Sequence, residues 1–156
     1  MATAASSPPT APSCWGGSDH GRAYAQARAK PTFETQAFWD ACNRGELLYQ
    51  KCSACGHVQF FPRSLCAKCH DADMTWERSQ GRGTLHTFSI VHRPPTEAFK
   101  PDVPYVLALI DMAEGFRMMT NVVNCDPDSL DIGTPIRIVF ERRGEQMIPQ
   151  AEVADH

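Results

Sequence analysis

Four cysteines in this chain have the spacing of a metal site. Cys52, Cys55, Cys66 and Cys69 form a Cys-x2-Cys-x10-Cys-x2-Cys array. Each Cys-x-x-Cys pair turns two sulfur atoms to one side, and two pairs joined by a short hairpin supply four thiolates to one tetrahedral cation. Zinc is the cation typical of this spacing, and four sulfur ligands leave no coordination position for water. The array therefore predicts a structural zinc site rather than a catalytic one.

Two other metal sites share part of this pattern. The second pair continues as Cys66-Ala67-Lys68-Cys69-His70, which is the attachment motif of a c-type haem. Haem attachment would leave the first pair without a role and would normally require export. An iron redox centre also uses four tetrahedral thiolates, so iron stays an alternative to zinc. His57 and His70 lie beside the array, and we expect them at the surface or as hydrogen-bond donors near the metal.

Composition limits the classes of protein that fit. The chain has 156 residues, a formal charge of −3, 21% charged and 42% hydrophobic residues. This length suits one compact domain, or a small zinc module attached to a modest core. The charge gives no broad basic field that would attract nucleic-acid phosphates.

Targeting signals and membrane spans are not predicted. The longest apolar stretch, residues 105–110, is much shorter than the roughly 20 residues that cross a bilayer. The first thirty residues lack the basic start and apolar centre of a secretory signal. We therefore expect a cytoplasmic protein, in which reduced thiols bind metal rather than form disulfides.

Three segments follow from the pattern along the chain. Residues 1–30 are rich in Ala, Ser, Pro and Gly, which predicts an extended tail. Residues 31–76 are expected to form a short helix plus the zinc ribbon, and residues 77–156 a barrel domain. In the helix, Thr35 is a suitable N-cap residue, Phe38 and Cys42 fall on one face, and Gly45 ends it.

The remaining pattern is mainly β. Residues 46–51 and 58–61 predict strands on either side of the first cysteine pair, and the barrel strands are expected at 84–92, 105–112, 115–123 and 136–140. Gly81-Arg82-Gly83 allows a bend or bulge at the start of the first barrel strand. A hairpin turn is expected at 113–115 and a single helical turn near 126–128. Short strands with one longer connection favour a small OB-type barrel, with an SH3-like barrel as the second choice.

Together these residues resemble a bacterial and archaeal family that joins an N-terminal rubredoxin-like zinc ribbon to a C-terminal OB-fold, long catalogued as a domain of unknown function. The resemblance covers about residues 38–140. Its marks are Phe38-Trp39, Gly45-Glu46-Leu47, the two cysteine pairs, Phe61-Pro62-Arg63, Trp76, Gly81-Arg82-Gly83, Pro104-Tyr105, Glu114-Gly115 and Leu130-Asp131-Ile132-Gly133.

The resemblance implies a non-catalytic accessory subunit that associates with a thiolase-like enzyme and shapes its acyl-CoA channel. It implies a structural Zn2+, a thiolase-like partner subunit, and coenzyme A or acyl-CoA as a ligand of the complex. A CoA site needs a few cations at its mouth and an uncharged wall. We expect Phe61, Arg63, Arg82 and Gly83 to contact the acyl-CoA or the partner, although Arg63 also suits bracing of the hairpin and Phe61 a plain core role.

Catalysis by the chain itself has little support in its sequence. Cys125 is the only free cysteine in the barrel segment, and the neighbouring Asp126 opposes ionisation of its thiol. His86 and His92 share a face of one predicted strand but lie about 20 Å apart unless a bulge intervenes. We therefore expect no catalytic residue.

Two other functions remain as alternatives. Zinc ribbons and OB barrels both occur in proteins that bind single-stranded nucleic acid, but residues 44–78 carry five basic and four acidic residues and show no basic stripe. An iron redox protein would also use the four cysteines, and it would show a visible absorption spectrum that zinc does not give.

Overall fold

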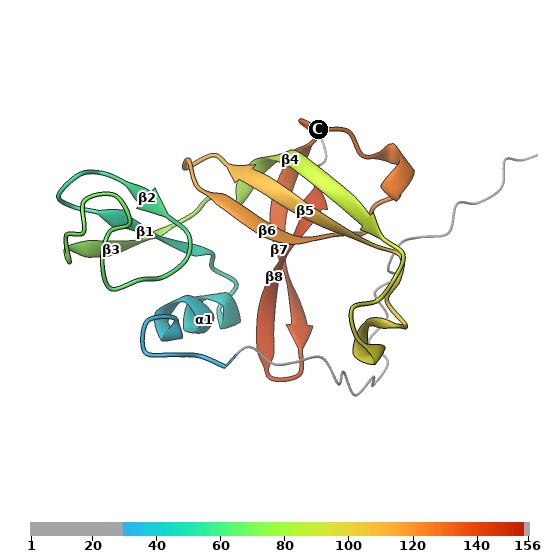
Figure 1. The fold of residues 1–156 in the computed structure, drawn as a ribbon, viewed down its shortest axis with the longest axis horizontal. Helices are drawn as coiled ribbons and strands as arrows, with labels where there is room; N and C mark the ends of the chain where they lie inside the picture. The colour runs from blue at the N-terminus through green and yellow to red at the C-terminus, as the bar shows by residue number, and fades with distance from the viewer. Residues whose placement is uncertain (1–29, 155–156) are drawn as a thin grey trace, which may run out of the picture.

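The computed structural model describes residues 30–154, the side chain of Ala98 excepted, so the predicted tail up to residue 29 and Cys14 lie outside the described residues. The described chain is mainly β, as predicted (Figure 1). Its elements are helix α1 (Gln36–Asn43), ribbon strands β1 (Leu48–Cys52), β2 (Val58–Gln59) and β3 (Met74–Arg78), barrel strands β4 (Arg82–Val91), β5 (Tyr105–Met112), β6 (Arg117–Val123), β7 (Pro135–Arg143) and β8 (Gln146–Val153), and the short 3-10 turns η1 (Glu97–Phe99) and η2 (Pro127–Ser129).

Helix α1 follows its predicted pattern, with one change at the cap. Phe38 and Cys42 are both buried, and Gly45 leaves the helix at φ +76°. The backbone N–H of Glu46 donates to Ala41 O at 3.0 Å, which closes the helix end. Thr35 does occupy the N-cap position, but its hydroxyl accepts from the backbone N–H of Thr32 at 2.8 Å and caps no helix amide.

The ribbon is a three-stranded antiparallel sheet in the order β2-β1-β3. Strand β1 pairs with both neighbours, Gln50 facing Gln59 on one side and Trp76 on the other. Strands β1 and β2 were predicted, although β2 ends at Gln59 rather than Phe61. Strand β3 was not predicted.

The second module is a closed barrel in the order β4-β5-β6-β8-β7. All pairs are antiparallel except β6 with β8, which run parallel. This closed five-stranded barrel confirms the OB-type prediction. The hairpin turn between β5 and β6 and the helical turn η2 also lie where the sequence predicted them.

Two details of the barrel differ from the prediction. Strand β8 was not predicted, and the register shift in β4 lies between Leu85 and Thr87 instead of at the glycines. Gly81 provides the bend, at φ +69°. Gly83 allows a close crossing of strands, because a Cβ there would lie 2.6 Å from the backbone oxygen of Asp111.

One hydrophobic core runs from the helix through the ribbon into the barrel, and includes Phe38, Tyr49, Phe116 and Ile110. Helix α1 lies between the ribbon and the β7–β8 hairpin (Figure 1). In the link between ribbon and barrel, Glu114 of the β5–β6 turn accepts hydrogen bonds from the Ser79 hydroxyl at 2.9 Å and the Gln80 N–H at 2.6 Å. The ribbon is therefore attached to the barrel by packing and hydrogen bonds as well as by the chain.

Candidate metal centre and neighbouring surface

The four predicted cysteines meet at one point of the ribbon. Their sulfur atoms all lie within 4.8 Å of one another. Cys52 Sγ is 3.6 Å from Cys69 Sγ, and Cys55 Sγ is 3.7 Å from Cys66 Sγ. Zinc–sulfur bonds of about 2.3 Å in a tetrahedron place the sulfurs about 3.8 Å apart. The arrangement therefore fits a tetrahedral metal ion bound by one sulfur from each cysteine.

Each cysteine pair is turned by the residue that follows it. Gly56 has φ +70° and its N–H donates to Cys52 O at 2.8 Å. His70 takes the same place after the second pair, with φ +61° and its N–H donating to Cys66 O at 3.0 Å. His70 is exposed, and the cluster in the described residues consists of the four cysteines without a histidine.

The cysteine thiols differ in how readily they ionise. Backbone N–H groups of Cys69 and Lys68 donate to the sulfur of Cys66 and lower the pKa of this thiol to about 6. Burial instead raises the pKa of the Cys42 thiol to about 12. Cys125 is also buried in the core. The thiolate is thus favoured at Cys66 and opposed at Cys42. At Cys69 the backbone N–H of Asp71 favours the thiolate, but the neighbouring cysteine side chains and burial outweigh it and raise the pKa of this thiol to about 12.

The four predicted contact residues come from two places. Phe61 and Arg63 lie on the ribbon and are both exposed, Phe61 to 67%. Arg82 is exposed at the start of β4, and the neighbouring Gly83 is half-buried under β5. The ribbon pair and the barrel pair therefore lie on different modules of the described chain.

An arrangement that sequence reasoning missed lies on the outer barrel face. Asp111 Oδ1 is 2.6 Å from Arg117 Nε, and Asp111 Oδ2 is 2.9 Å from His86 Nδ1. Arg117, followed by His86, holds the pKa of the Asp111 carboxyl below its usual range. Beside them is a surface hollow of about 360 Å³, lined by Asp111, Met112, Gly115, Phe116 and Arg117. Strand register alone brings these side chains together, so spacing in the sequence gave no signal for them.

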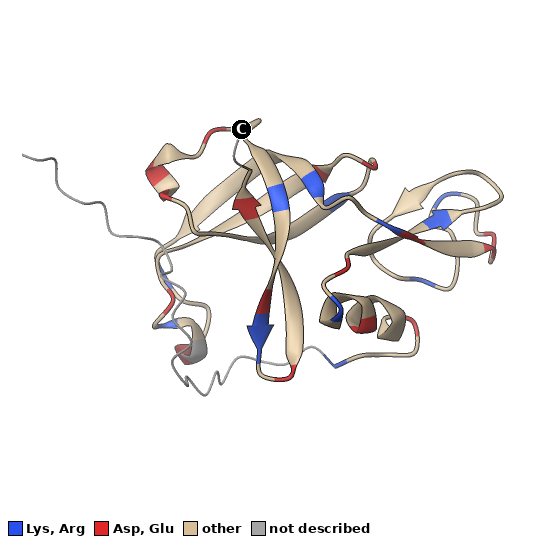
Figure 2. Ribbon diagram, turned by 180° about the vertical axis from the view of Figure 1, so that it is seen from behind, with Lys and Arg blue, Asp and Glu red and all other residues tan. Residues whose placement is uncertain are grey.

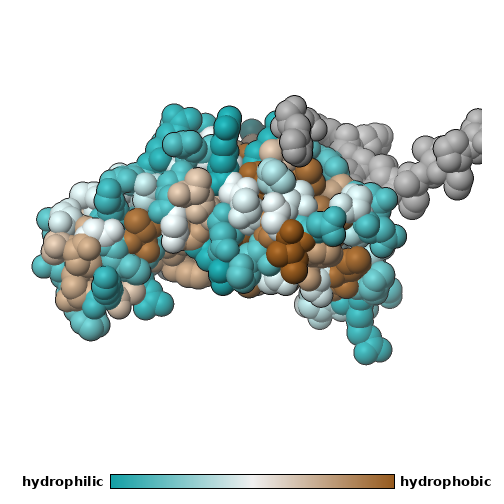
Figure 3. Space-filling model, turned by 90° about the horizontal axis from the view of Figure 1, so that it is seen from above, coloured by the Kyte–Doolittle hydropathy of each residue, from teal (hydrophilic) through white to brown (hydrophobic). Residues whose placement is uncertain are grey.

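The surface shows no basic stripe in the described residues. Lys and Arg alternate with Asp and Glu over both modules (Figure 2). On the face seen from above, apolar patches on the barrel half are separated by polar residues (Figure 3). No helix in residues 30–154 is long and apolar enough to cross a membrane. The mixed distribution of charges does not favour nucleic acid as the ligand.

Comparison with known proteins matches two family models to successive parts of the chain. Residues 39–75 match the family model of the ChsH2 rubredoxin-like zinc ribbon domain, and residues 76–141 that of the ChsH2 C-terminal OB-fold domain. A DUF35 domain-containing scaffold protein of Methanothermobacter thermautotrophicus is 36% identical over 104 residues, which are 66% of this chain and 77% of the relative.

Two further matches extend this comparison. A probable enoyl-CoA hydratase alpha subunit of Thermomonospora curvata is 36% identical over 101 residues, 64% of this chain but only 31% of that protein. A solved chain described as Ltp2-ChsH2(DUF35) aldolase superposes with a TM-score of 0.74 and 29% identity, covering 82% of this chain and 100% of the other. The chain therefore belongs to the DUF35 family, whose ChsH2 members join a zinc ribbon to a C-terminal OB-fold domain.

Proposed function

We propose that this chain is a non-catalytic, zinc-binding subunit of a thiolase-like acyl-CoA enzyme complex, acting in β-ketoacyl-CoA thiolysis or related C–C bond chemistry of lipid, sterol or aromatic acyl-CoA metabolism. The observation that carries the proposal is the match over the full length of a chain described as Ltp2-ChsH2(DUF35) aldolase. Relatives named as a scaffold protein and as a hydratase alpha subunit support a role beside an enzyme. The proposal places the complex in the cytoplasm, where thiols remain reduced.

Zinc has a structural role in this proposal. Cys52, Cys55, Cys66 and Cys69 would hold the ion and fix the hairpin that projects from the barrel. Structural zinc sites contribute about 10–16 kcal/mol of apparent binding free energy. That is as large as the total stability of a whole domain, about 5–15 kcal/mol, so the small ribbon depends on its metal.

The core thiols support a non-catalytic role. A nucleophilic cysteine needs an accessible thiolate with a base within hydrogen-bond reach. Cys42 and Cys125 are both buried, and burial keeps Cys42 protonated. His86 is turned toward Asp111 on the outside of the barrel, and neither of these thiols reaches that surface. The acyl-transfer chemistry would therefore come from the partner.

The chain would shape the partner's acyl-CoA channel through exposed cations beside apolar surface. Arg63 and Arg82 are exposed and suit the phosphates of coenzyme A or the carboxylates of the partner. Phe61 supplies an apolar wall, and Gly83 supports Arg82 through its close packing. Arg63→Ala should lower turnover by the complex while circular dichroism stays unchanged.

The experiment is co-purification at native expression level. The tagged chain is isolated gently, the enzyme that accompanies it is identified, and zinc and the visible spectrum are measured in the same sample. We expect an acyl-CoA enzyme, about one zinc per chain, and no visible band, since zinc has a filled d shell. A chain that processes a thioester unaided, or that carries coloured iron, contradicts the proposal.

A further inference from the structure

The loop between β2 and the second cysteine pair exposes large apolar side chains. This segment, residues 60–65, is the ribbon loop. In the ribbon loop Phe61 is 67% and Leu65 is 49% exposed. Phe33 is 99% exposed, and the next residue, Glu34, bonds to Ser64 of the loop. Apolar side chains gathered at the surface mark sites of interaction.

Two buried glutamines hold the ribbon loop from inside. Gln50 Oε1 accepts from Gln59 Nε2 at 2.9 Å and from the backbone N–H of Arg63 at 2.9 Å. Gln59 Oε1 accepts from the backbone N–H of Ala67 at 3.0 Å. Both glutamines are under 9% exposed, although they belong to a usually exposed residue type. Their amides replace the strand pairing that ends at Gln59.

A third side chain holds the loop from outside. Glu34 Oε1 accepts from the backbone N–H of Ser64 at 3.0 Å and also from the Ser64 hydroxyl. These bonds, the hydroxyl first, hold the pKa of the Glu34 carboxyl below its usual range. The segment before α1 is thereby tied to the ribbon loop.

The backbone is therefore held at Arg63 and Ser64 within the loop and at Ala67 just after it, while Phe61 and Leu65 remain exposed. A loop that is ordered before binding loses little conformational entropy when it binds, which favours affinity. We propose that the ribbon loop is the preformed docking surface for the enzyme subunit, with Phe61 as its anchor and Gln50, Gln59 and Glu34 as positioning residues. This inference rests on the proposed function and specifies the surface that the partner meets.

Charge indicates the chemistry of the partner surface. Residues 53–70 contain Arg63 and Lys68 and no acidic residue. Four thiolates and one zinc ion carry a formal charge of about −2, and Lys68 lies within the second cysteine pair, where it offsets this charge. Arg63 remains as the cation of the loop, and the nearby Glu34 carboxylate already accepts hydrogen bonds from Ser64. The loop thus fits an apolar pocket on the partner with a carboxylate at its rim.

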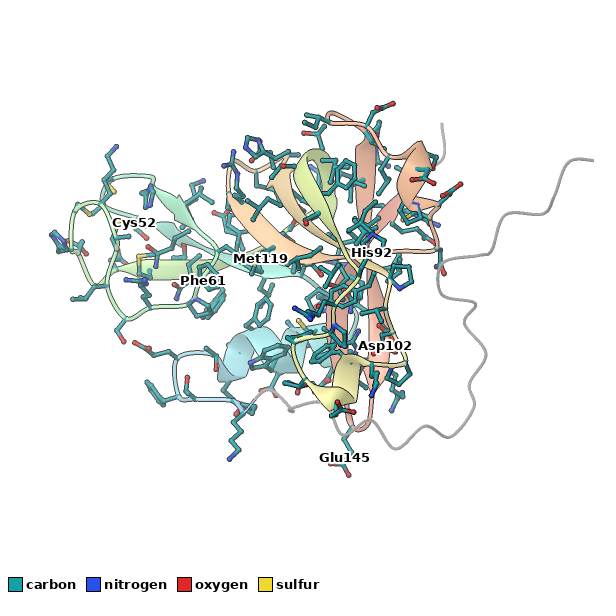
Figure 4. All side chains as sticks on the ribbon, turned by 45° about the vertical axis from the view of Figure 1, so that its right-hand side comes forward. Cys52, Phe61, His92, Asp102, Met119 and Glu145 are labelled. Atoms are coloured by element: carbon teal, nitrogen blue, oxygen red, sulfur yellow. The ribbon has the colours of Figure 1, made fainter. Side chains whose placement is uncertain are left out.

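The barrel offers matched controls at a distance from the loop. Phe61 lies on the ribbon, while His92 and Asp102 mark the other end of the molecule (Figure 4). Ile132, between β6 and β7, is 73% exposed, slightly more than Phe61. Replacing Ile132 by alanine tests whether the loss of any exposed apolar side chain weakens binding of the partner.

The first test measures binding of the purified partner enzyme, identified by co-purification, to the full zinc-loaded chain by calorimetry. Phe61→Ala should weaken binding by about 30-fold or more, as loss of an interface anchor does. Ile132→Ala should change it by less than about twofold. Wild-type affinity in Phe61→Ala, or an equal loss in Ile132→Ala, would overturn the inference while leaving the proposed function intact.

The second test needs no partner and examines the positioning residues. Hydrogen exchange of the Arg63, Ser64 and Ala67 amides is followed in the zinc-loaded chain. Protection should fall by about tenfold at Ser64 in Glu34→Gln and at Ala67 in Gln59→Leu, with zinc content unchanged. Unprotected amides in the wild type would show that the loop is not preformed. If no acyl-CoA enzyme co-purifies, the proposed function fails separately.

Discussion

The ring of Phe60, directly after ribbon strand β2, stacks parallel on the ring of Phe116 in the β5–β6 turn of the barrel, with centroids 5.2 Å apart and planes at 3°. Phe116 also packs against Tyr49 of β1 at 5.2 Å, and Phe60 meets Phe38 of α1 edge-on at 5.6 Å. One barrel turn is therefore packed against the ribbon directly and against the helix through Phe60. Zinc binding in the ribbon should thus affect the stability of the barrel.

Phe116→Ala tests this shared core. Phe116 is 4% exposed, and replacement of a buried phenylalanine by alanine costs about 3–5 kcal/mol. We expect a loss of this size in the free energy of unfolding, measured by urea denaturation at fixed zinc concentration. The control is Phe61→Ala, where the ring is exposed and the change should stay within about 0.5 kcal/mol. Similar unfolding midpoints for the two variants would contradict the packing of the ribbon on the barrel.

Cys52→Ser tests the metal centre. Cys52 is buried and faces Cys69 within the cluster, so the change removes one of four sulfur ligands. Zinc content should fall from about one ion per chain to near zero, because structural sites depend on all four ligands. The hairpin should unfold and the partner should be released together. Zinc is measured by mass spectrometry and the complex by size-exclusion chromatography.

A matched control separates loss of the ligand from loss of any buried thiol. Cys125 is buried like Cys52 but lies in the barrel, outside the cluster. Cys125→Ala should retain full zinc content. Retention of both zinc and partner in Cys52→Ser would contradict the assignment of the site.

Tyr49 should titrate at unusually high pH. Its hydroxyl donates to Glu77 Oε2 at 2.6 Å, and this bond, with burial, raises the pKa of Tyr49 to about 12. An unfolded tyrosine has a pKa of about 10. The folded state therefore binds the proton more tightly, so the stabilisation is complete below about pH 10 and is lost as pH rises from about 10 to 12.

Absorbance of ionised tyrosine measures this titration. The chain has three tyrosines, and Tyr49→Phe should remove a late step near pH 12. Glu77→Gln removes the charged acceptor, so the step should move to lower pH. A high-pH titration unaltered by Tyr49→Phe would show that the hydrogen bond to Glu77 is not formed.

The sequence predicted the features that depend on neighbouring residues. Four cysteines separated by short spacers meet whatever the rest of the chain does, and the run of apolar residues in β5 identifies a strand without any partner. Strand β8 lacks such a signal, because it contains Pro149 and the polar residues Gln146 and Gln150. Gln150 is buried because Thr120 and the backbone of Asn121 bond to its side chain across the barrel.

The positioning residues of the ribbon loop could not be predicted for a related reason. Glutamine is usually exposed, and nothing near Gln50 or Gln59 in the sequence shows that the two side chains meet across β1 and β2. Pairing of Gln50 with Gln59 in the register buries both amides at once. The same holds for His86, Asp111 and Arg117, which come from three strands and meet only when the barrel closes.

Gly83→Ala tests whether a predicted contact residue acts through packing. A Cβ at Gly83 would lie 2.6 Å from Asp111 O and 2.8 Å from Ile110 Cγ2, so β4 and β5 would have to separate. Overpacking of this kind typically costs about 1–3 kcal/mol, which a shift in the urea midpoint measures. Arg82→Ala, at the adjacent exposed position, should change stability by less than about 0.5 kcal/mol. A loss of complex activity in Arg82→Ala at unchanged stability would assign the contact to the arginine, whereas an unchanged midpoint in Gly83→Ala would contradict the close crossing of the two strands.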